Sequence, residues 1–491
     1  MRESGILLPV SALPAGYGIG GFSKKAYEFV DWLGAAGQKN WQILPLGPTS
    51  YGDSPYQSFS TFAGNPYYID LDTLKEEGLL TEEECREADC GQEPRYVNYG
   101  KIYETRFAVL GKAFSRFRET EEFRKFCEDN AFWLEDYGLY MALKGRQGQK
   151  SWQEWPEELK RRDPEALSEM REVLAEEIRF YRFLQYSFDR QWKKLKKYAN
   201  DQGIRIIGDI PIYVALDSAD AWAEPELFQF DENRRPVAVA GCPPDAFAAT
   251  GQLWGNPLYR WEYHRETGYD WWIRRIAYCF RLYDVVRIDH FRGFESYYSI
   301  PYGDRTAEKG HWEKGPGIGF FRTVQEKLGA LAIIAEDLGY LTDDVRKMLK
   351  ESGYPGMKVL EFAFDSREES DYLPHNYTRS CVVYTGTHDN NTLAGWYQEL
   401  APEDREFSIR YLNNAKSTPE EIPWDFIRMA QASVADLAVV PMQDYLGLGA
   451  EARFNYPSTI GTNWKWRLLP EECTEKLAEK IRAMTKLYGR L

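Results

Sequence analysis

Residues 284–293 read DVVRIDHFRG, a short apolar run that ends in charged residues. Runs of about four to eight apolar residues are typical of buried parallel strands. Side chains alternate along a strand, so Arg287 and Asp289 should share one face. A guanidinium beside a carboxylate favours the ionised form that a nucleophile needs, although the same pair also occurs as an ordinary salt bridge. The stretch predicts a buried strand that ends in a candidate catalytic carboxylate.

Seven further apolar runs have the same character. With 284–289 they make eight candidate strands, the others lying at 5–10, 40–45, 204–209, 331–336, 357–360, 381–384 and 437–440. Apolar residues at helical spacing in 22–36, 319–329 and 341–351 predict helices between several of these strands. Strands that alternate with helices form a parallel sheet. Eight such units predict an α/β protein with a (β/α)8 TIM barrel.

The chain has 491 residues, far more than the roughly 250 of a plain barrel, so insertions must supply the remainder. We expect residues 1–71 to hold barrel strands 1 and 2, and residues 72–200 to form a large, mainly helical insertion subdomain. Residues 201–491 should hold the rest of the barrel. A Pro-, Gly- and Trp-rich insertion at about 211–275 is expected to form loops that cover the active site at the barrel mouth. The end of the chain predicts no separate C-terminal β-domain.

Composition narrows the classes of function. The net charge of −15 is unsuited to a nucleic-acid partner, which needs a basic footprint. We find no apolar run near the roughly 20 residues that span a bilayer and no signal-peptide pattern, so we expect no membrane association and a cytoplasmic location. Aromatic residues make up 15% of the chain, with 16 Trp and 33 Tyr, which slightly favours a carbohydrate ligand. The seven scattered cysteines predict neither a disulfide framework nor a zinc site.

Acidic residues stand at or just beyond the ends of four predicted strands: Asp209, Asp289, Glu336 and Asp389. Barrel active sites lie at the carboxyl ends of the strands. A single acid after a strand is more often a helix cap or a turn residue, but four at equivalent places indicate a catalytic site. Asp337 is an alternative to Glu336 at its strand end, and Asp389 or its neighbour Asn390 could instead cap the next helix.

Two of the five histidines, His290 and His388, adjoin these acids. Histidine beside a carboxylate can hold sugar hydroxyls through charge-assisted hydrogen bonds, or it can bind a metal. Their spacing offers no pair of the HxxxH type, so we expect no metal site.

Six stretches together resemble a known family. RIDHFRG at 287–293, AEDLG at 335–339 and TGTHDN at 385–390 are similar to signature regions of the α-amylase superfamily. GDIPIYV at 208–214 is similar to a further region in its 4-α-glucanotransferase form, with Tyr213-Val214 where amylases usually have Asn-His. YGDSPYQ at 51–57 and GQLWGNP at 251–257 resemble amylomaltases and their plant disproportionating relatives. The resemblance to the 4-α-glucanotransferase (amylomaltase) family runs from the first strand to about residue 465.

This resemblance implies roles for individual residues. Asp289 would be the nucleophile, Glu336 the general acid/base and Asp389 the transition-state stabiliser. The sugar-binding residues that it implies are Tyr51, Ser54, Tyr56, Asp209, Asp245, Gln252, Trp254, Arg287, His388 and Asn463. The family implies neither a metal nor an organic cofactor.

The activity implied is retaining transfer of α-1,4-glucan segments between maltodextrins or to glucose, through a covalent glucosyl-enzyme. The partners would be maltooligosaccharides, glucans derived from starch or glycogen, and glucose. An α-glucan hydrolase on the same scaffold is the alternative, since it would use the same three acids. A catalytically silent glucan-binding protein should lack at least one of them, and all three are present.

Overall fold

The protein is described here from a computed structural model, which covers all residues except 1, 51, 89–92, 245–248, 340 and 415–416. Eight parallel strands form its central sheet, in the order β10-β11-β12-β1-β2-β3-β6-β9. These strands are β1 (Glu3–Leu7), β2 (Asn40–Gln42), β3 (Arg205–Ile210), β6 (Val285–Ile288), β9 (Ile333–Ala335), β10 (Gly356–Val359), β11 (Cys381–Tyr384) and β12 (Leu437–Pro441). Each overlaps one of the eight predicted strands, although the first begins at Glu3 rather than at residue 5.

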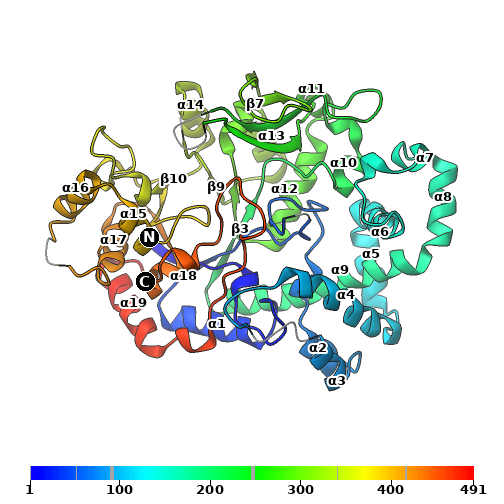
Figure 1. The fold of residues 1–491 in the computed structure, drawn as a ribbon, viewed down its shortest axis with the longest axis horizontal. Helices are drawn as coiled ribbons and strands as arrows, with labels where there is room; N and C mark the ends of the chain where they lie inside the picture. The colour runs from blue at the N-terminus through cyan, green and yellow to red at the C-terminus, as the bar shows by residue number, and fades with distance from the viewer. Residues whose placement is uncertain (1, 51, 89–92, 245–248, 340, 415–416) are drawn as a thin grey trace.

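The sheet curls until its two edge strands meet. The backbone N–H of Ala335, on β9, donates to the carbonyl of Pro355 just before β10 at 3.0 Å. The Asp337 carboxylate, two residues beyond β9, accepts a hydrogen bond of 2.6 Å from the N–H of Met357 on β10. The strands lie at the centre of Figure 1 with helices around them. The prediction of a (β/α)8 barrel is confirmed.

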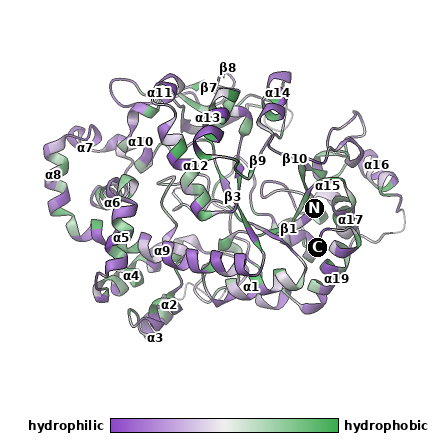
Figure 2. Cartoon of the chain, turned by 180° about the vertical axis from the view of Figure 1, so that it is seen from behind, coloured by the Kyte–Doolittle hydropathy of each residue, from purple (hydrophilic) through white to green (hydrophobic). Residues whose placement is uncertain are grey.

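Helices cover the outside of the barrel with their apolar faces turned inward. This layer includes α1 (Lys24–Ala35), α12 (Asp270–Leu282), α13 (Ile318–Leu328), α14 (Asp343–Ser352), α17 (Ile422–Ala432) and α19 (Glu475–Leu487). Figure 2 shows the resulting division, with hydrophilic residues on the outward faces of these helices. Residues 360–380, all of which the structure describes, join β10 to β11 through two 3₁₀ turns, Leu360–Phe362 and Pro374–Asn376.

The helical insertion lies to one side of the barrel, on the right of Figure 1. It contains α2 (Leu71–Glu76), α3 (Glu82–Glu87), α4 (Tyr99–Arg116), α5 (Glu121–Asp129), α6 (Ala131–Arg146), α7 (Glu157–Lys160), α8 (Pro164–Val173) and α9 (Ala175–Asp201). The last of these, α9, contacts both α6 of the insertion and α1 and β3 of the barrel. A single long helix therefore joins the insertion to the barrel and extends past the predicted boundary at residue 200.

The segment after β3 carries more regular structure than the predicted loops. It contains α10 (Ala219–Ala223), β4 (Ala238–Cys242), β5 (Gln252–Pro257) and α11 (Trp261–Glu266). Strands β4 and β5 form a four-stranded antiparallel sheet with β7 (Ser296–Pro301) and β8 (His311–Lys314), in the order β5-β4-β7-β8. Strands this short, interrupted by Gly and Pro, gave no clear alternating pattern in the sequence.

The C-terminal part of the chain completes the barrel wall. Before β12 lie α15 (Leu393–Glu399) and α16 (Pro402–Leu412), and α18 (Met442–Leu446) follows it. Residues 442–491, all described, contain helices and turns and no strand, as predicted. Near the end, the fully buried Arg490 side chain donates to the backbone carbonyls of Glu3, Gln431 and Ser433. None of the helices in the described ranges has the length and apolar character that crossing a membrane would require.

Candidate active site

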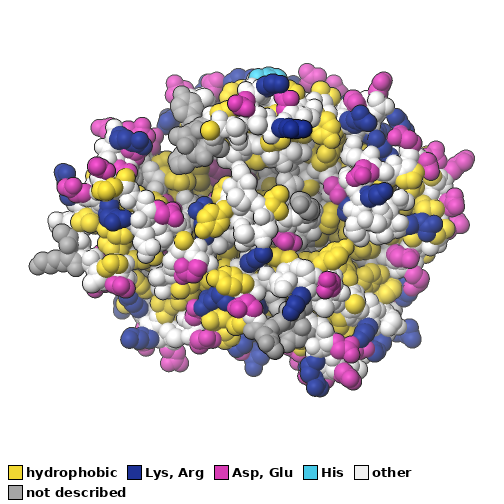
Figure 3. All heavy atoms as spheres, viewed as in Figure 1, with side chains coloured by type: hydrophobic (Ala, Val, Ile, Leu, Met, Phe, Trp, Pro, Cys, Tyr) yellow, Lys and Arg dark blue, Asp and Glu magenta, His cyan; other side chains and the backbone are white. Residues whose placement is uncertain are grey.

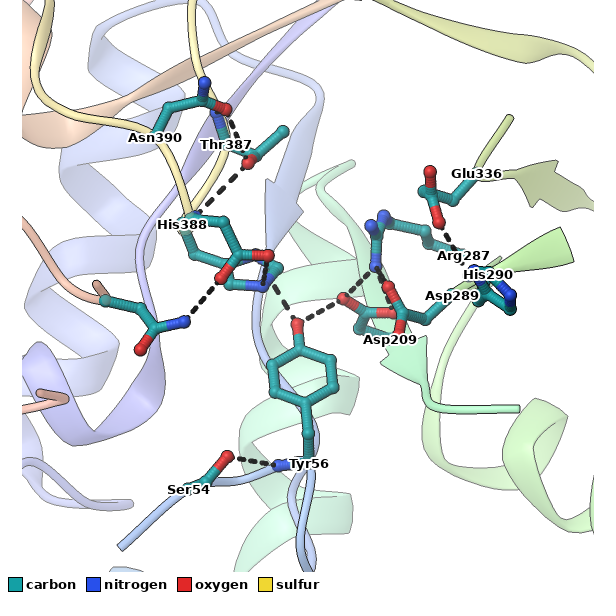
Figure 4. Close-up of polar contacts among 12 residues, drawn as sticks. Ser54, Tyr56, Asp209, Arg287, Asp289, His290, Glu336, Thr387, His388 and Asn390 are labelled. Atoms are coloured by element: carbon teal, nitrogen blue, oxygen red, sulfur yellow. Dashed lines mark hydrogen bonds and ion pairs between the residues drawn. The ribbon is translucent and has the colours of Figure 1, made fainter. Parts of the chain in front are cut away.

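The barrel brings the predicted acids together, because the carboxyl ends of parallel strands lie at one edge. Asp209 is on β3, Asp289 follows β6 and Glu336 follows β9, and these three strands are neighbours in the sheet. The backbone continues this pairing beyond the strands: the N–H of Asp289 donates to Ile210 at 3.0 Å and that of Glu336 to Ile288 at 3.0 Å. Figure 4 shows the side chains that gather there.

Arg287 links two of the carboxylates. Its Nη1 atom lies 2.6 Å from Oδ2 of Asp209 and 3.0 Å from Oδ1 of Asp289, which confirms that Arg287 and Asp289 share a face. Asp209 is completely buried, whereas the Asp289 side chain is 30% exposed. Asp209 therefore binds the guanidinium on its buried side, while Asp289 lies on the more exposed side of the site.

The electrostatic prediction for Asp289 needs a correction. Arg287 does favour its ionised form, but burial has the larger effect and the net result is a pKa raised to about 6. Asp209 and Asp389 add to the increase by repulsion. Asp289 is thus mostly ionised at neutral pH, with a smaller margin than the salt bridge alone suggests.

Glu336 is held by backbone groups on two sides. Its Oε2 atom accepts a hydrogen bond of 2.7 Å from the N–H of His290, and its Oε1 atom accepts one of 2.7 Å from Leu338. His290 adopts a left-handed conformation, with φ of 53°, next to the nucleophile candidate. Burial, with repulsion from Asp289, raises the pKa of Glu336 to about 7, so it can carry a proton at neutral pH.

The alternative acid, Asp337, points elsewhere. Its carboxylate is buried and accepts the N–H of Met357 on the neighbouring strand β10. Adjacent side chains of an extended segment diverge, and here only Glu336 faces Asp289 and His290. Geometry thus favours Glu336 as the second carboxyl group of the site.

Tyr56 reaches in from the loop after β2 and bridges the two halves of the site (Figure 4). Its hydroxyl group donates to Oδ2 of Asp209 at 2.7 Å and lies 3.4 Å from Nδ1 of His388. The Tyr56 ring stacks on the His388 imidazole with centroids 5.0 Å apart. Ser54 accepts the N–H of Tyr56 at 3.2 Å, which helps to set the loop.

Asp389 is surrounded by hydrogen-bond donors. His388 Nε2 lies 3.3 Å from its Oδ2 atom, and Asn455 donates to its Oδ1 atom at 2.6 Å. Arg453 holds the Asp389 backbone carbonyl at 2.6 Å. Burial alone would raise the pKa of Asp389, but His388 and Asn455 outweigh it and lower the pKa below the usual range. The same pairing raises the pKa of His388 against the opposing effect of burial.

Neither Asp389 nor Asn390 caps the following helix. Thr392 is the N-cap of α15, where its side chain accepts the N–H of Gly395 at 3.1 Å. Asn390 instead accepts two hydrogen bonds from Thr387, at 3.0 and 2.8 Å, within its own turn. Asp389 is therefore free of a capping role.

Some of the predicted sugar-binding residues flank this centre. The Trp254 ring packs edge-on against His290, with centroids 4.9 Å apart, and its Nε1 atom donates to Gln252 at 3.0 Å. Asn463 is buried and uses its side chain to bind Tyr456 and Thr459 of its own loop. The predicted residues Tyr51 and Asp245 lie outside the described residues.

Two residues that bind Asp389, Arg453 and Asn455, were not predicted from the sequence; they follow α18 and lie more than sixty positions along the chain from Asp389. Both belong to the stretch ARFN at 452–455, whose residues show neither a strand nor a helix pattern. In the described part of the chain, no group of three or more His, Cys, Asp or Glu side chains is placed to hold a metal ion.

Two carboxyl groups at neighbouring strand ends of a barrel, one paired with an arginine and the other held by backbone N–H groups, are typical of enzymes that act on glycosidic bonds. Comparison with known proteins gives the family. The model of the 4-α-glucanotransferase family matches residues 8–472. The chain belongs to this family, which confirms the resemblance seen in the sequence.

Individual relatives are similar to this chain over nearly their whole length. A 4-α-glucanotransferase of Clostridium butyricum is 50% identical over 486 residues, covering 98% of this chain and 99% of its own. One of Streptococcus pneumoniae is 49% identical over 495 residues, covering 100% and 98%. The structure of an amylomaltase from Streptococcus agalactiae in complex with acarbose matches with a TM-score of 0.97 and 43% identity, covering 100% of both chains. These similarities support a transferase rather than the alternative hydrolase.

Proposed function

We propose that this enzyme transfers α-1,4-glucan segments between maltooligosaccharides, or to glucose, with retention of configuration. The observation that carries the mechanism is the pairing of Asp289 with Glu336 at the ends of β6 and β9. Asp289 is fixed by Arg287, and Glu336 is fixed by two backbone N–H groups. Two carboxyl groups with different proton affinities are what a retaining mechanism requires.

In the first half-reaction, Glu336 donates its proton to the glycosidic oxygen of the donor chain while Asp289 attacks the anomeric carbon. The bond to the leaving sugar breaks, that sugar departs with the proton as a free 4-hydroxyl group, and a covalent β-glucosyl-enzyme forms on Asp289. The raised pKa of Glu336 keeps the proton available at neutral pH.

In the second half-reaction, Glu336, now ionised, removes the proton from the 4-hydroxyl group of an acceptor sugar. The acceptor oxygen attacks the anomeric carbon, the bond to Asp289 breaks, and the α-linkage is restored. Glu336 regains its proton, so the two carboxyl groups return to their starting states. Transfer exceeds hydrolysis when the acceptor is oriented better than water.

Asp389 is proposed to stabilise the positive charge that develops on the sugar ring. Its low pKa keeps it ionised throughout, and its hydrogen bond from Asn455 and contact with His388 fix its position. A preorganised negative charge of this kind is worth most where water is excluded. His388 and Arg287 are placed to hold sugar hydroxyls or the neighbouring carboxylates in the same region.

The sugar subsites are proposed to lie around this centre, with Trp254 and Gln252 on the His290 side and Tyr56, Ser54 and His388 on the other. Figure 3, drawn in the view of Figure 1, shows hydrophobic side chains near the middle of the visible face and charged ones around its rim. Stacking on aromatic rings suits the apolar faces of glucose units. Tyr51, Asp245 and Asn463 complete the proposed set, and Asp209 is proposed to act through Tyr56 and Arg287.

The wider setting is also part of the proposal. Donors and acceptors would be maltooligosaccharides, starch- or glycogen-derived glucans and glucose, which fits a relative whose structure holds acarbose. We propose a cytoplasmic enzyme that needs neither a metal nor an organic cofactor. Residues 1–71, 72–200 and 201–491 are proposed as its structural divisions, with residues 211–275 over the active site.

Incubation with pure maltotriose tests the activity, with products followed by chromatography. Glucose together with maltopentaose and longer chains, at a constant number of glycosidic bonds, is the expected result. Glucose and maltose alone would mean hydrolysis and would overturn the proposal. Asp289→Asn should lose turnover but keep maltodextrin binding; a variant that still disproportionates maltotriose would remove Asp289 as nucleophile.

A further inference from the structure

The turn that carries His388 and Asp389 rests on two buried carboxyl groups outside the proposed chemistry. Glu361 lies in the 3₁₀ turn that follows β10, and Asp444 lies in α18. Glu361 is 8% exposed and Asp444 is 1% exposed. Neither residue belongs to the set predicted from the sequence, and burying a carboxyl group is costly unless it is paired or hydrogen-bonded.

Glu361 packs directly beneath the turn. Its backbone N–H donates to the carbonyl of Thr385 at 3.2 Å, which aligns the end of β10 with the end of β11. A Cβ atom at Gly386 would lie 2.7 Å from Oε1 of Glu361 and 3.2 Å from Cβ of Asn390. Gly386 is outside the left-handed region, so it is the close approach of the carboxyl group, rather than the backbone conformation, that favours glycine there.

Asp444 ties the two ends of the same turn. Its Oδ2 atom accepts a hydrogen bond of 2.6 Å from the Thr385 hydroxyl group, and its Oδ1 atom accepts one of 2.8 Å from the N–H of Leu393. Between these two points lie His388 and Asp389. One carboxylate therefore fixes both ends of the segment, while Glu361 fills the space under it.

The charge on Glu361 matters because its carboxyl group packs against Gly386, which precedes Asp389 by three residues in the same turn. Burial, with repulsion from Asp444, raises the pKa of Glu361 well above its usual range. Arg453 and a hydrogen bond with Asn390 oppose this increase, and Glu399 adds to it. Burial therefore favours the neutral form of the Glu361 carboxyl group, which adds no second negative charge beneath the turn.

We propose that Glu361 is a positioning residue for Asp389: its buried carboxyl group, packed under Gly386 and assisted by Asp444, sets the position of the turn that presents Asp389 to the reacting sugar. The inference rests on the proposed role of Asp389. It assigns Glu361 no contact with substrate. Its effect is on geometry, and displacement of a catalytic group by about 1 Å can cost on the order of 100-fold in rate.

The test compares Glu361→Gln and Glu361→Ala in the maltotriose reaction. The glutamine variant keeps the shape of the side chain and adds no charge, so its kcat should stay within about twofold of the wild type. The alanine variant leaves a gap under Gly386, and its kcat should fall by at least about tenfold while KM changes little, because only transition-state stabilisation is lost. Equal kcat values for the alanine variant and the wild type would overturn the proposal.

Two further variants separate positioning from general damage. Ile481→Ala removes a buried side chain from α19, which packs on α1 and α17, so it should lower stability without changing kcat below its unfolding temperature. If Glu361→Ala fails to fold, Gly386→Ala replaces it, since a methyl group there would lie 2.7 Å from Oε1 of Glu361, so that the turn and the carboxyl group cannot both keep their positions. A normal kcat for that variant would equally refute the proposal.

Asp389→Asn is measured in parallel to keep the two claims apart. If it retains full turnover, the proposed function fails at Asp389 and the positioning role falls with it. If it is inactive while Glu361→Ala is normal, only the positioning role is wrong. Inactivity of Asp389→Asn with a selective loss of kcat in Glu361→Ala is the result that supports both.

Discussion

Replacement of Asp209 by asparagine should damage both the stability of the enzyme and its turnover. The Asp209 carboxylate is fully buried and accepts three hydrogen bonds, two from Arg287 at 2.8 and 2.6 Å and one from Tyr56 at 2.7 Å. The amide cannot neutralise Arg287, and its NH₂ group must face a donor. Removing one partner of a buried ion pair typically costs about 3–5 kcal/mol.

Part of that cost is offset here, because Asp289 remains 3.0 Å from the same guanidinium. We therefore expect a loss of about 3 kcal/mol in the free energy of unfolding, at the low end of the range for a broken buried pair. The guanidinium should shift toward Asp289, and Tyr56 should lose its anchor beside His388. A fall in kcat of at least about tenfold is the expected consequence, as for other small displacements of catalytic groups.

Urea unfolding followed by tryptophan fluorescence measures the stability, and initial rates with maltotriose measure kcat. Asp201→Asn is the matched control, because Asp201 pairs with Lys197 on the exposed face of α9 and exposed pairs contribute little. The control should unfold at the same urea concentration as the wild type. If Asp209→Asn also did so with an unchanged kcat, the idea that Asp209 supports the site from below would be refuted.

Three other changes follow from the same geometry. Transfer should decline as the pH rises through about 7, because burial raises the pKa of Glu336 to about 7 and the general acid must be protonated. A plot of kcat/KM against pH measures this decline, and activity that stays constant up to pH 9 would contradict the prediction. Asn455→Ala removes the hydrogen bond of 2.6 Å to Asp389 and should lower kcat by about tenfold with little change in KM, since a hydrogen bond to a charged group contributes about 1.5–3 kcal/mol. A change confined to KM would count against the proposed role of Asp389. Arg490→Ala removes three hydrogen bonds to backbone carbonyls and should lower the free energy of unfolding by about 3 kcal/mol while kcat at low temperature stays unchanged, which calorimetry and rate assays together measure.

The barrel and its acids could be predicted because both depend on local patterns. Each buried strand is a short apolar run, and the carboxyl ends of parallel strands must meet at one edge. That rule alone places Asp289 and Glu336 side by side. The rule does not say whether Glu336 or Asp337 is the catalytic residue. That choice needs the three-dimensional structure, in which Asp337 accepts a hydrogen bond from Met357.

Other features depend on contacts between distant segments. Asn455 and Arg453 reach Asp389 from a turn after α18, and nothing in their own neighbourhood predicts it. The antiparallel sheet of β4, β5, β7 and β8 could not be predicted because its strands are short and its central pair, β4 and β7, is far apart in the chain. The pKa of Asp289 also required the fold, since burial outweighs the attraction of Arg287 that the sequence suggested.

The central claim is that Asp289 forms the covalent intermediate and Glu336 transfers the proton. The most direct test treats Glu336→Gln with α-maltotriosyl fluoride, a donor whose leaving group needs little acid assistance, and analyses the quenched protein by peptide mass spectrometry. Because the variant lacks the base for the second half-reaction, a maltotriosyl adduct should accumulate on the peptide that contains Asp289. An adduct on another residue, or steady turnover of the fluoride without any adduct, would contradict the account.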